Sequence, residues 1–184
     1  MTIFFWVTGA IVVFVALVFF TYYNRFVRLT NQIENSFSQI DVQLKKRADL
    51  VPNLVSSVKG YMKHEAKIIN SVTDARKALV GAKDFNGKIR AGDQLQAAIG
   101  RLFAIAENYP NLKANENFLH LQQELSSIED KIAYARQYYN DGIMSYNTLS
   151  TTIPGIWFAS MFGFKKKDYL HIPDAERKAV KVEF

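Results

Sequence analysis

An uncharged, mostly apolar stretch runs from Ile3 to Tyr23 and constrains the fold more than any other feature. Because an α-helix rises about 1.5 Å per residue, about twenty such residues cross a bilayer core about 30 Å thick. A cleaved signal peptide and a buried core helix are the alternatives, but no basic residue precedes the stretch and no clear small-residue cleavage site follows it. Trp6 and Tyr22-Tyr23 stand where aromatic belts mark membrane edges. We therefore predict a transmembrane anchor over residues 1–24, with the lipid bilayer as a partner.

The charges beside this stretch predict its orientation. Arg25 and Arg28 follow it directly, whereas the other side has only the amino terminus. Positively charged residues next to a span favour the cytoplasmic side. We therefore predict a single-pass protein with its N-terminus outside and its longer C-terminal part in the cytoplasm. The competing arrangement puts that part in the periplasm or on the cell surface.

Apolar residues then recur every three or four positions, which is typical of amphipathic helices. Pro52 has no N–H group to donate, so we predict that the first helix kinks or restarts there, with Asp49 capping the new start. A second apolar series continues from Leu54 to Leu79. The first series extends the transmembrane helix without a glycine or proline: Phe26, Leu29, Ile33, Phe37, Ile40 and Leu44.

The second half of the chain predicts two more helices. A glycine-containing segment from Gly81 to Gly92 predicts a loop, after which Asp93 opens a shorter helix that ends at the turn around Pro110. The last apolar series, from Phe118 to Tyr146, alternates steps of three and four, as in nearly antiparallel helix packing. We therefore predict an all-α fold in which the N-terminal transmembrane helix continues into an antiparallel up-and-down four-helix bundle over residues 25–150.

The remaining residues, 151–184, form a predicted C-terminal tail that contains IWFASMFGFKKK. This segment is too short to span a membrane. It either docks on the end of the bundle or lies in the membrane interface, where aromatic side chains enter the headgroup boundary and lysines attract anionic lipid. The candidate membrane-interfacial residues are Trp157, Phe158, Phe162, Lys165, Lys166 and Lys167.

The block from Gln39 to Glu65 carries the string QIDVQLKKRADLVPNLV, followed by KGY and HE. Together with later motifs, this block resembles the LemA family of bacterial membrane-anchored proteins, and the resemblance covers nearly the whole chain to about Phe164. It implies a helical protein at the bacterial cell (inner) membrane, and it implies an architecture more clearly than an activity. The later motifs are Tyr109–Ala114, Glu124-Leu125, Arg136, Tyr139-Asn140 and Tyr146-Asn147.

The residues give little support to catalysis or cofactor binding. The chain has no cysteine, which excludes a disulfide framework, a thiol nucleophile and a thiolate metal site. His64-Glu65 lacks the second histidine of a zinc protease motif, because position 68 is Ile68. The formal charge of +6 lies near the anchor and in the tail, without an aromatic-interleaved basic patch, so we predict no nucleic-acid partner. We predict a non-enzymatic protein without a cofactor or metal.

The polar residues around Pro52 form the candidate partner-facing surface of an interaction or scaffolding module. Its partner would be an unidentified membrane or envelope protein or, for an apolar helix face, a second copy of the chain. The alternative is an accessory component of a membrane-associated protease or hydrolase system, with Asp41, Lys45, Asp49 and Asn53 forming a site. A salt-linked exposed face is the simplest interpretation of such a row. The candidate partner-facing residues are Asp41, Lys45, Lys46, Arg47, Asp49 and Asn53.

Overall fold

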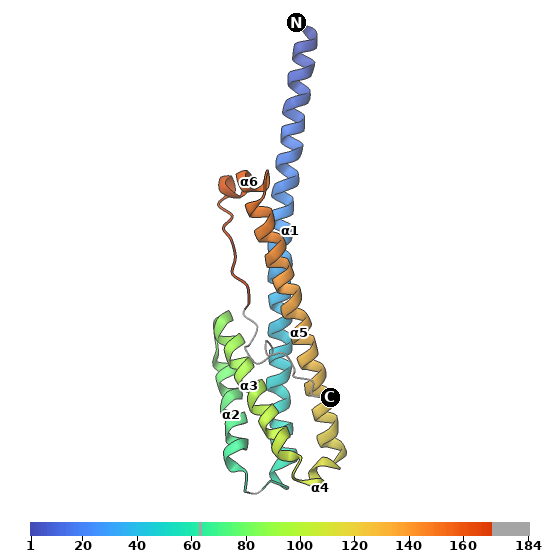
Figure 1. Ribbon diagram of the computed structural model, residues 1–184, viewed down its shortest axis with the longest axis vertical. Coiled ribbons are helices and arrows are strands. Elements are labelled where there is room, and N and C mark those ends of the chain that lie inside the picture. Colours follow the sequence, from blue (N-terminus) through green and yellow to red (C-terminus); the bar gives the residue numbers. More distant parts are fainter. Residues whose placement is uncertain (63, 171–184) are drawn as a thin grey trace, which may run out of the picture. The chain divides into compact units, whose positions relative to one another are not determined.

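The computed structural model of the protein describes residues 1–62 and 64–170. These residues form helices α1 (Thr2–Lys59), α2 (Ala66–Gly81), α3 (Phe85–Ala106), α4 (Pro110–Lys113), α5 (Glu116–Thr151) and α6 (Gly155–Phe162) (Figure 1). No strand occurs in these two ranges. The predicted all-α class is confirmed, whereas the four-helix bundle stays a prediction.

The described residues pack into two compact units. Unit 1 contains residues 1–37 and 136–170, and unit 2 contains residues 38–135. The long helices α1 and α5 contribute to both units, and unit 1 joins two segments that are far apart in the sequence. The predicted division into anchor, bundle and tail stays a prediction.

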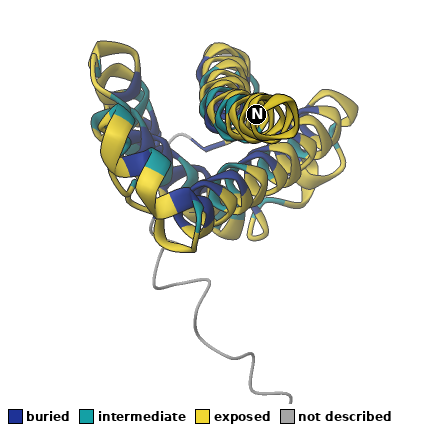
Figure 2. Ribbon diagram, turned by 90° about the horizontal axis from the view of Figure 1, so that it is seen from above, coloured by how far each residue is buried: buried dark blue, intermediate teal, exposed yellow. Residues whose placement is uncertain are grey.

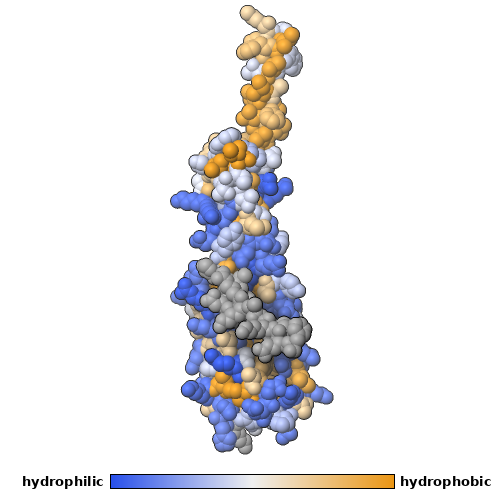
Figure 3. Space-filling model, in the orientation of Figure 1, coloured by the Kyte–Doolittle hydropathy of each residue, from blue (hydrophilic) through white to orange (hydrophobic). Residues whose placement is uncertain are grey.

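The N-terminal part of α1 is apolar and largely exposed (Figures 2 and 3). Among the described residues, α1 is the one helix that is long and apolar enough to cross a membrane, and none of its most apolar stretch is buried. The core helix of a soluble protein would instead be mostly buried. This exposure is consistent with the predicted anchor and argues against a buried core helix.

Unit 1 is built on the part of α1 that follows the apolar stretch. Phe26 and Ile33 are 0% and 5% exposed and belong to one apolar cluster with Ile143 and Tyr146 of α5. A Cβ atom at Gly142 would lie 3.1 Å from Cγ1 of Ile33, so the glycine permits α5 to approach α1 closely. Gly142, which lies within the predicted last apolar series, therefore has a packing role.

Two asparagines of α5 fix the chain that follows α6. The Asn147 side chain donates to the Lys167 carbonyl and accepts from the Lys167 N–H, both at 2.9 Å. Asn140 brackets Leu170 in the same way, at 3.2 and 2.9 Å. An asparagine amide carries a donor and an acceptor side by side, so it pairs with backbone as a neighbouring strand would. Of the predicted tail, residues 171–184 lie outside the described residues.

Helix α1 runs through Pro52 without a restart, so the predicted new helix start with Asp49 as its cap is wrong. An interior proline leaves the carbonyl four residues earlier without its donor and costs about 3 kcal/mol or more. Here Nε of Arg76, on α2, donates to that Ala48 carbonyl at 2.8 Å. Leu54, beyond the proline, is 0% exposed. The replaced hydrogen bond and the continued burial offset the cost of the proline.

The predicted second apolar series is divided between two helices. α1 ends at Lys59 and α2 begins at Ala66. Between them the Met62 N–H donates to the Val58 carbonyl at 2.9 Å, and Met62 is 1% exposed. The apolar period thus continues through a turn, because the turn itself buries a side chain.

Helix α3 begins at Phe85, so the predicted loop from Gly81 to Gly92 and the predicted start at Asp93 are wrong. The Asp84 side chain accepts a hydrogen bond from the Gly87 N–H at 2.9 Å and caps the helix. A Cβ atom at Gly92 would lie 2.6 Å from Cδ2 of Leu44. The absence of a side chain at Gly92, inside α3, therefore allows Leu44 of α1 to pack closely against this helix.

Helix α5 carries the predicted last apolar series. Phe118, Leu125 and Ile132 are 3%, 4% and 0% exposed. The helix ends at Thr151, beyond Tyr146, which is the last residue of the predicted apolar series.

Candidate functional site

The exposed members of the predicted partner-facing set lie on α1 within unit 2. Lys45, Lys46, Asp49 and Asn53 are exposed, and we name these four residues the α1 ridge. Three of them follow one another at four-residue spacing, so they share one side of the helix. Asp41 lies one turn earlier and is half-buried.

Arg47 does not belong to this exposed surface, because it is only 1% exposed. Its prediction as a partner-facing residue is therefore corrected. Nη1 of Arg47 donates to the Gly92 carbonyl of α3 at 3.2 Å, and Nη2 forms an ion pair with the Glu129 carboxylate of α5. Position 47 follows Leu44 by three residues and precedes Val51 by four, and both neighbours are buried. The helical period thus turns Arg47 inward, where it joins three helices.

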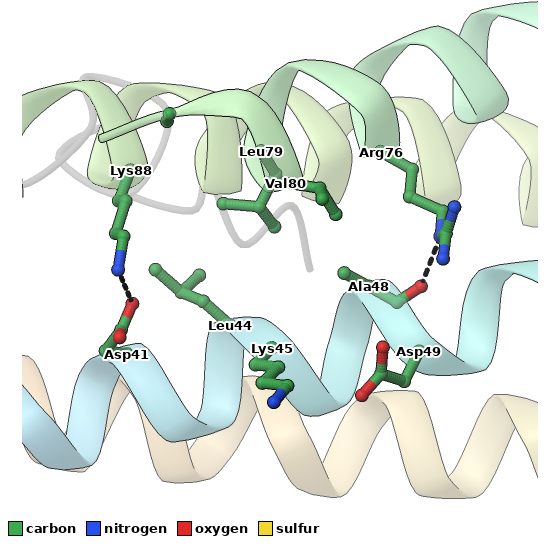
Figure 4. Close-up of a pocket in the computed structure, with 10 residues that line it drawn as sticks. Asp41, Leu44, Lys45, Ala48, Asp49, Arg76, Leu79, Val80 and Lys88 are labelled. Atoms are coloured by element: carbon green, nitrogen blue, oxygen red, sulfur yellow. Dashed lines mark hydrogen bonds and ion pairs between the residues drawn. The ribbon is translucent and has the colours of Figure 1, made fainter. Parts of the chain in front are cut away.

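A hollow of about 340 Å³ lies between the α1 ridge and α2, and we name it the α2 hollow (Figure 4). Apolar side chains of α1 and α2 face each other across it, while charged groups lie at its two ends (Figure 4). Its lining residues are Asp41, Leu44, Lys45, Ala48, Asp49, Arg76, Leu79, Val80, Ala82 and Lys88.

Two polar bridges close the ends of the α2 hollow. Nζ of Lys88 donates to Oδ1 of Asp41 at 2.6 Å, and Arg76 donates to the Ala48 carbonyl (Figure 4). Lys45, on the α1 ridge, takes no part in these bridges. The sequence interpretation missed Lys88 and Arg76. Because Pro52 lacks an N–H group, the sequence indicates that the Ala48 carbonyl needs another donor, such as Arg76. No local sequence pattern indicates the contact of Lys88.

A second hollow, of about 460 Å³, lies between the α1 ridge and α5, and we name it the α5 hollow. Asp49 lines both hollows, whereas Asn53 lines neither. The four residues considered for a hydrolase-type site, which include Asp41 and Lys45, therefore do not share one hollow. The lining residues of the α5 hollow are Gln43, Lys46, Asp49, Leu50, Glu124, Ser127, Ile128 and Lys131.

The chemistry of both hollows suits binding. Each combines apolar side chains with charged groups of both signs, which can contact a protein segment through burial and ion pairs. Within residues 1–62 and 64–170, no group of three or more His, Cys, Asp or Glu side chains could coordinate a metal ion. Lys45 and Lys46 have no ion-pair partner in this described part of the chain.

The tyrosine of the YPNLKA motif has a structural position. The Tyr109 hydroxyl donates to Oε1 of Glu65 at 3.2 Å and so joins the turn before α4 to the start of α2. Burial, followed by the hydrogen bond and the negative charge of Glu65, raises the pKa of Tyr109. The hydroxyl therefore stays protonated at neutral pH and acts as a donor. Asn115 follows the motif and caps α5, since its Oδ1 accepts from the Phe118 N–H at 3.1 Å.

The candidate membrane-interfacial residues differ in their contacts and exposure within unit 1. Phe158 stacks on Tyr22 with ring centroids 4.9 Å apart, and Phe162 lies 5.1 Å from Phe19, so these two side chains pack against α1. Trp157 is 63% exposed. Lys167 lies over the Tyr146 ring at 5.3 Å, whereas Lys165 and Lys166 are exposed.

Comparison with known proteins identifies a matching family and several similar proteins. A model of the LemA family matches residues 36–184. Among similar proteins is Protein LemA of Metamycoplasma hominis, which is 29% identical over 68% of this chain and 58% of that protein.

Magnetosome proteins are also similar. Magnetosome protein MamQ of Magnetospirillum gryphiswaldense is 28% identical over 81% of this chain and 64% of that protein. Magnetosome protein MamQ 2 of Paramagnetospirillum magneticum is 27% identical over 80% of this chain and 64% of that protein. The aligned part thus spans less than two thirds of the length of these relatives.

Proposed function

Because the chain belongs to the LemA family, we propose that it is a non-enzymatic, membrane-anchored helical-bundle protein that acts as an interaction or scaffolding module at the bacterial cell membrane. The observation that carries this proposal is the α1 ridge, which stands between two mixed apolar and charged hollows. The partner is a membrane or envelope protein. The exposed apolar stretch of α1 would retain the module beside such a partner.

The bundle itself is part of the proposal. In unit 2, Arg47 of α1 contacts both α3 and α5, and Arg76 of α2 contacts α1. α2 and α3 also pack against each other. These contacts support a bundle of α1, α2, α3 and α5 whose outer side on α1 stays available to a partner.

The exposed lysines favour acidic side chains of a partner segment, while Asp49 and Glu124 favour basic ones. Lys45 and Lys46 present two exposed ammonium groups, one beside each hollow. Lys131 adds a third at the α5 hollow. A segment with charges of both signs that lay over the α1 ridge would meet these lysines with its acidic side chains while its apolar side chains entered the hollows, as in helix recognition by grooves.

Reversing both exposed lysines, Lys45→Glu with Lys46→Glu, should remove partners without unfolding the protein. Exposed charges contribute only about 0 to 1 kcal/mol each to stability, so helicity and melting temperature should change little. The measurement is cross-linking in intact membranes followed by affinity capture and mass spectrometry. Proteins captured with the wild type should be depleted with the variant.

The matched control is Lys67→Glu with Lys83→Glu, which changes the net charge equally on two exposed residues of unit 2 outside the hollows. This control should retain the wild-type partners. The same captured set with both double variants would count against the α1 ridge as the binding surface.

The orientation in the membrane is also proposed, with the N-terminus outside and unit 2 in the cytoplasm. It is supported by Arg25 and Arg28 after the apolar stretch. A fluorescent protein fused after Phe184 should mature, because that end would be cytoplasmic. A phosphatase fused at the same position should stay inactive. An active phosphatase fusion would show that the protein has the opposite orientation.

A further inference from the structure

Helix α6 is fixed against the end of the apolar stretch of α1. Phe158 stacks on Tyr22, and Phe162 contacts Phe19 and Tyr23, each with ring centroids 5.1 Å apart. Figure 1 shows α6 beside this part of α1. The residues contacted are the last of the uncharged stretch, since Arg25 is the first charged residue of the chain.

The chain on both sides of α6 fixes this position. A Cβ atom at Gly155 would lie 2.0 Å from the Leu149 carbonyl oxygen, so only glycine permits this close return of the chain onto α5. Gly163 ends α6 with a φ of 71°, which favours glycine. Phe164 then stacks on Phe26 with ring centroids 4.5 Å apart.

The opposite side of α6 is exposed and, apart from Ser160, apolar. Ile156, Trp157 and Met161 are 43%, 63% and 65% exposed, and Ile153 just before the helix is 74% exposed. Positions 157 and 161 are spaced by four within α6, so their side chains lie along one side of the helix. An exposed side of this kind on an aromatic helix is typical of a segment that enters the membrane interface.

The depth of α6 follows from its contacts. If α1 crosses the bilayer with its uncharged stretch, the residues from Phe19 to Tyr23 occupy the last turn of the span, about 5.4 Å long. A helix packed against that turn lies at the boundary between acyl chains and headgroups. Tryptophan prefers this boundary, because its ring is apolar and its N–H is polar.

The charges at this end of unit 1 are mostly positive, although the exposed Asp168 follows the three lysines. The first acidic residue of the chain is Glu34, and the segment from Gly142 to Lys167 contains no acidic residue. Lys165 and Lys166 are exposed and are fixed between Phe164, stacked on α1, and Lys167, bracketed by Asn147. Anionic headgroups complement such a cluster.

We propose that α6 and the residues just before it form an interfacial membrane-binding element, with the exposed apolar side chains of Ile153, Ile156, Trp157 and Met161 inserted at the headgroup boundary and Lys165 and Lys166 contacting anionic phospholipid. This proposal goes beyond partner binding by unit 2. It shares with that function only the premise that α1 spans the bilayer, and a failure of partner capture leaves the lipid contact unaffected.

The test uses the full chain with Trp6→Phe, which leaves Trp157 as the single tryptophan. The protein is reconstituted into phosphatidylcholine vesicles and into equimolar phosphatidylcholine and phosphatidylglycerol vesicles. Trp157 fluorescence should be shifted to the blue, protected from aqueous acrylamide, and quenched more by lipids brominated near the headgroup than near the chain ends. Equal acrylamide access in vesicles and in denaturant, or stronger quenching by bromine at the chain ends, would overturn the proposal.

Two further measurements separate lipid from other occupants. Lys165→Gln with Lys166→Gln should lower the preference of Trp157 quenching for brominated phosphatidylglycerol over brominated phosphatidylcholine, by about fivefold per lysine. The matched control, Lys67→Gln with Lys83→Gln in unit 2, should leave that preference unchanged, and equal loss in both variants would overturn the role of the two lysines. If protection of Trp157 disappears on dilution of the protein in the bilayer, a second copy covers α6 and the lipid proposal is wrong.

Discussion

Replacing Arg47 by alanine is expected to lower the free energy of unfolding by about 3 to 5 kcal/mol. Arg47 is 1% exposed, forms an ion pair with Glu129 and donates to the Gly92 carbonyl. The alanine variant leaves Glu129 without its ion-pair partner, removes one of the donors to the Gly92 carbonyl and opens a cavity among three helices. The Glu129 side chain is 29% exposed and recovers some hydration, so we expect the lower part of this range. The measurement is denaturant unfolding of the full chain in detergent micelles, followed by circular dichroism.

The neighbouring variant Lys46→Ala is the control, since Lys46 is exposed and has no ion-pair partner among the described residues. It should change the free energy of unfolding by less than about 0.5 kcal/mol. Replacing the whole pair, Arg47→Met with Glu129→Leu, should restore most of the stability, because apolar packing can substitute for a buried ion pair. An Arg47→Ala variant as stable as Lys46→Ala would mean that the buried pair does not stabilise unit 2.

The sequence predicts the long helices because their signal is local. In α5 the apolar period continues from Phe118 onward, and the buried residues follow it. The same period could also have placed Arg47 correctly. Ile40, Leu44, Val51 and Leu54 form a buried stripe with steps of three and four, and position 47 fills its gap. The prediction of Arg47 as a partner-facing residue followed its charge, although the helical register puts position 47 in the buried stripe.

The start of α3 could not be predicted in this way, because its glycines weaken the local signal. A glycine in a helix costs about 1 kcal/mol relative to alanine, so a segment with three glycines predicts a loop. Packing outweighs that preference here, since Gly92 lies against Leu44 and Asp84 caps the helix. Contacts between residues that are distant in the sequence therefore determine where α3 begins.

The candidate site was predictable on α1 and not beyond it. Exposed charges on α1 identify Lys45, Lys46 and Asp49 directly, because they fall outside the buried stripe. Lys88 and Arg76 join them only because α2 and α3 fold back onto α1. The sequence pattern does not indicate that packing. It does indicate that the carbonyl four residues before Pro52 lacks its helical donor and requires another one.

Replacing Arg76 by alanine is therefore expected to lower the free energy of unfolding by about 1 to 3 kcal/mol, because the Ala48 carbonyl would lose its donor in a buried position. The same substitution in a Pro52→Ala background should cost clearly less, since residue 52 then supplies the N–H that proline lacks. The difference between the two costs is the coupling energy, measured by a double-mutant cycle in denaturant unfolding.

Lys77→Ala is the matched control for this cycle, because Lys77 is adjacent to Arg76 and its side chain is 70% exposed, in a surface pair with Asp74. It should change stability by less than about 0.5 kcal/mol in either background, since an exposed pair at this spacing contributes little. A cost of Arg76→Ala that is the same with proline or alanine at position 52 would contradict the exchange of donors. Proline would then be tolerated in α1 through burial of the following turn alone.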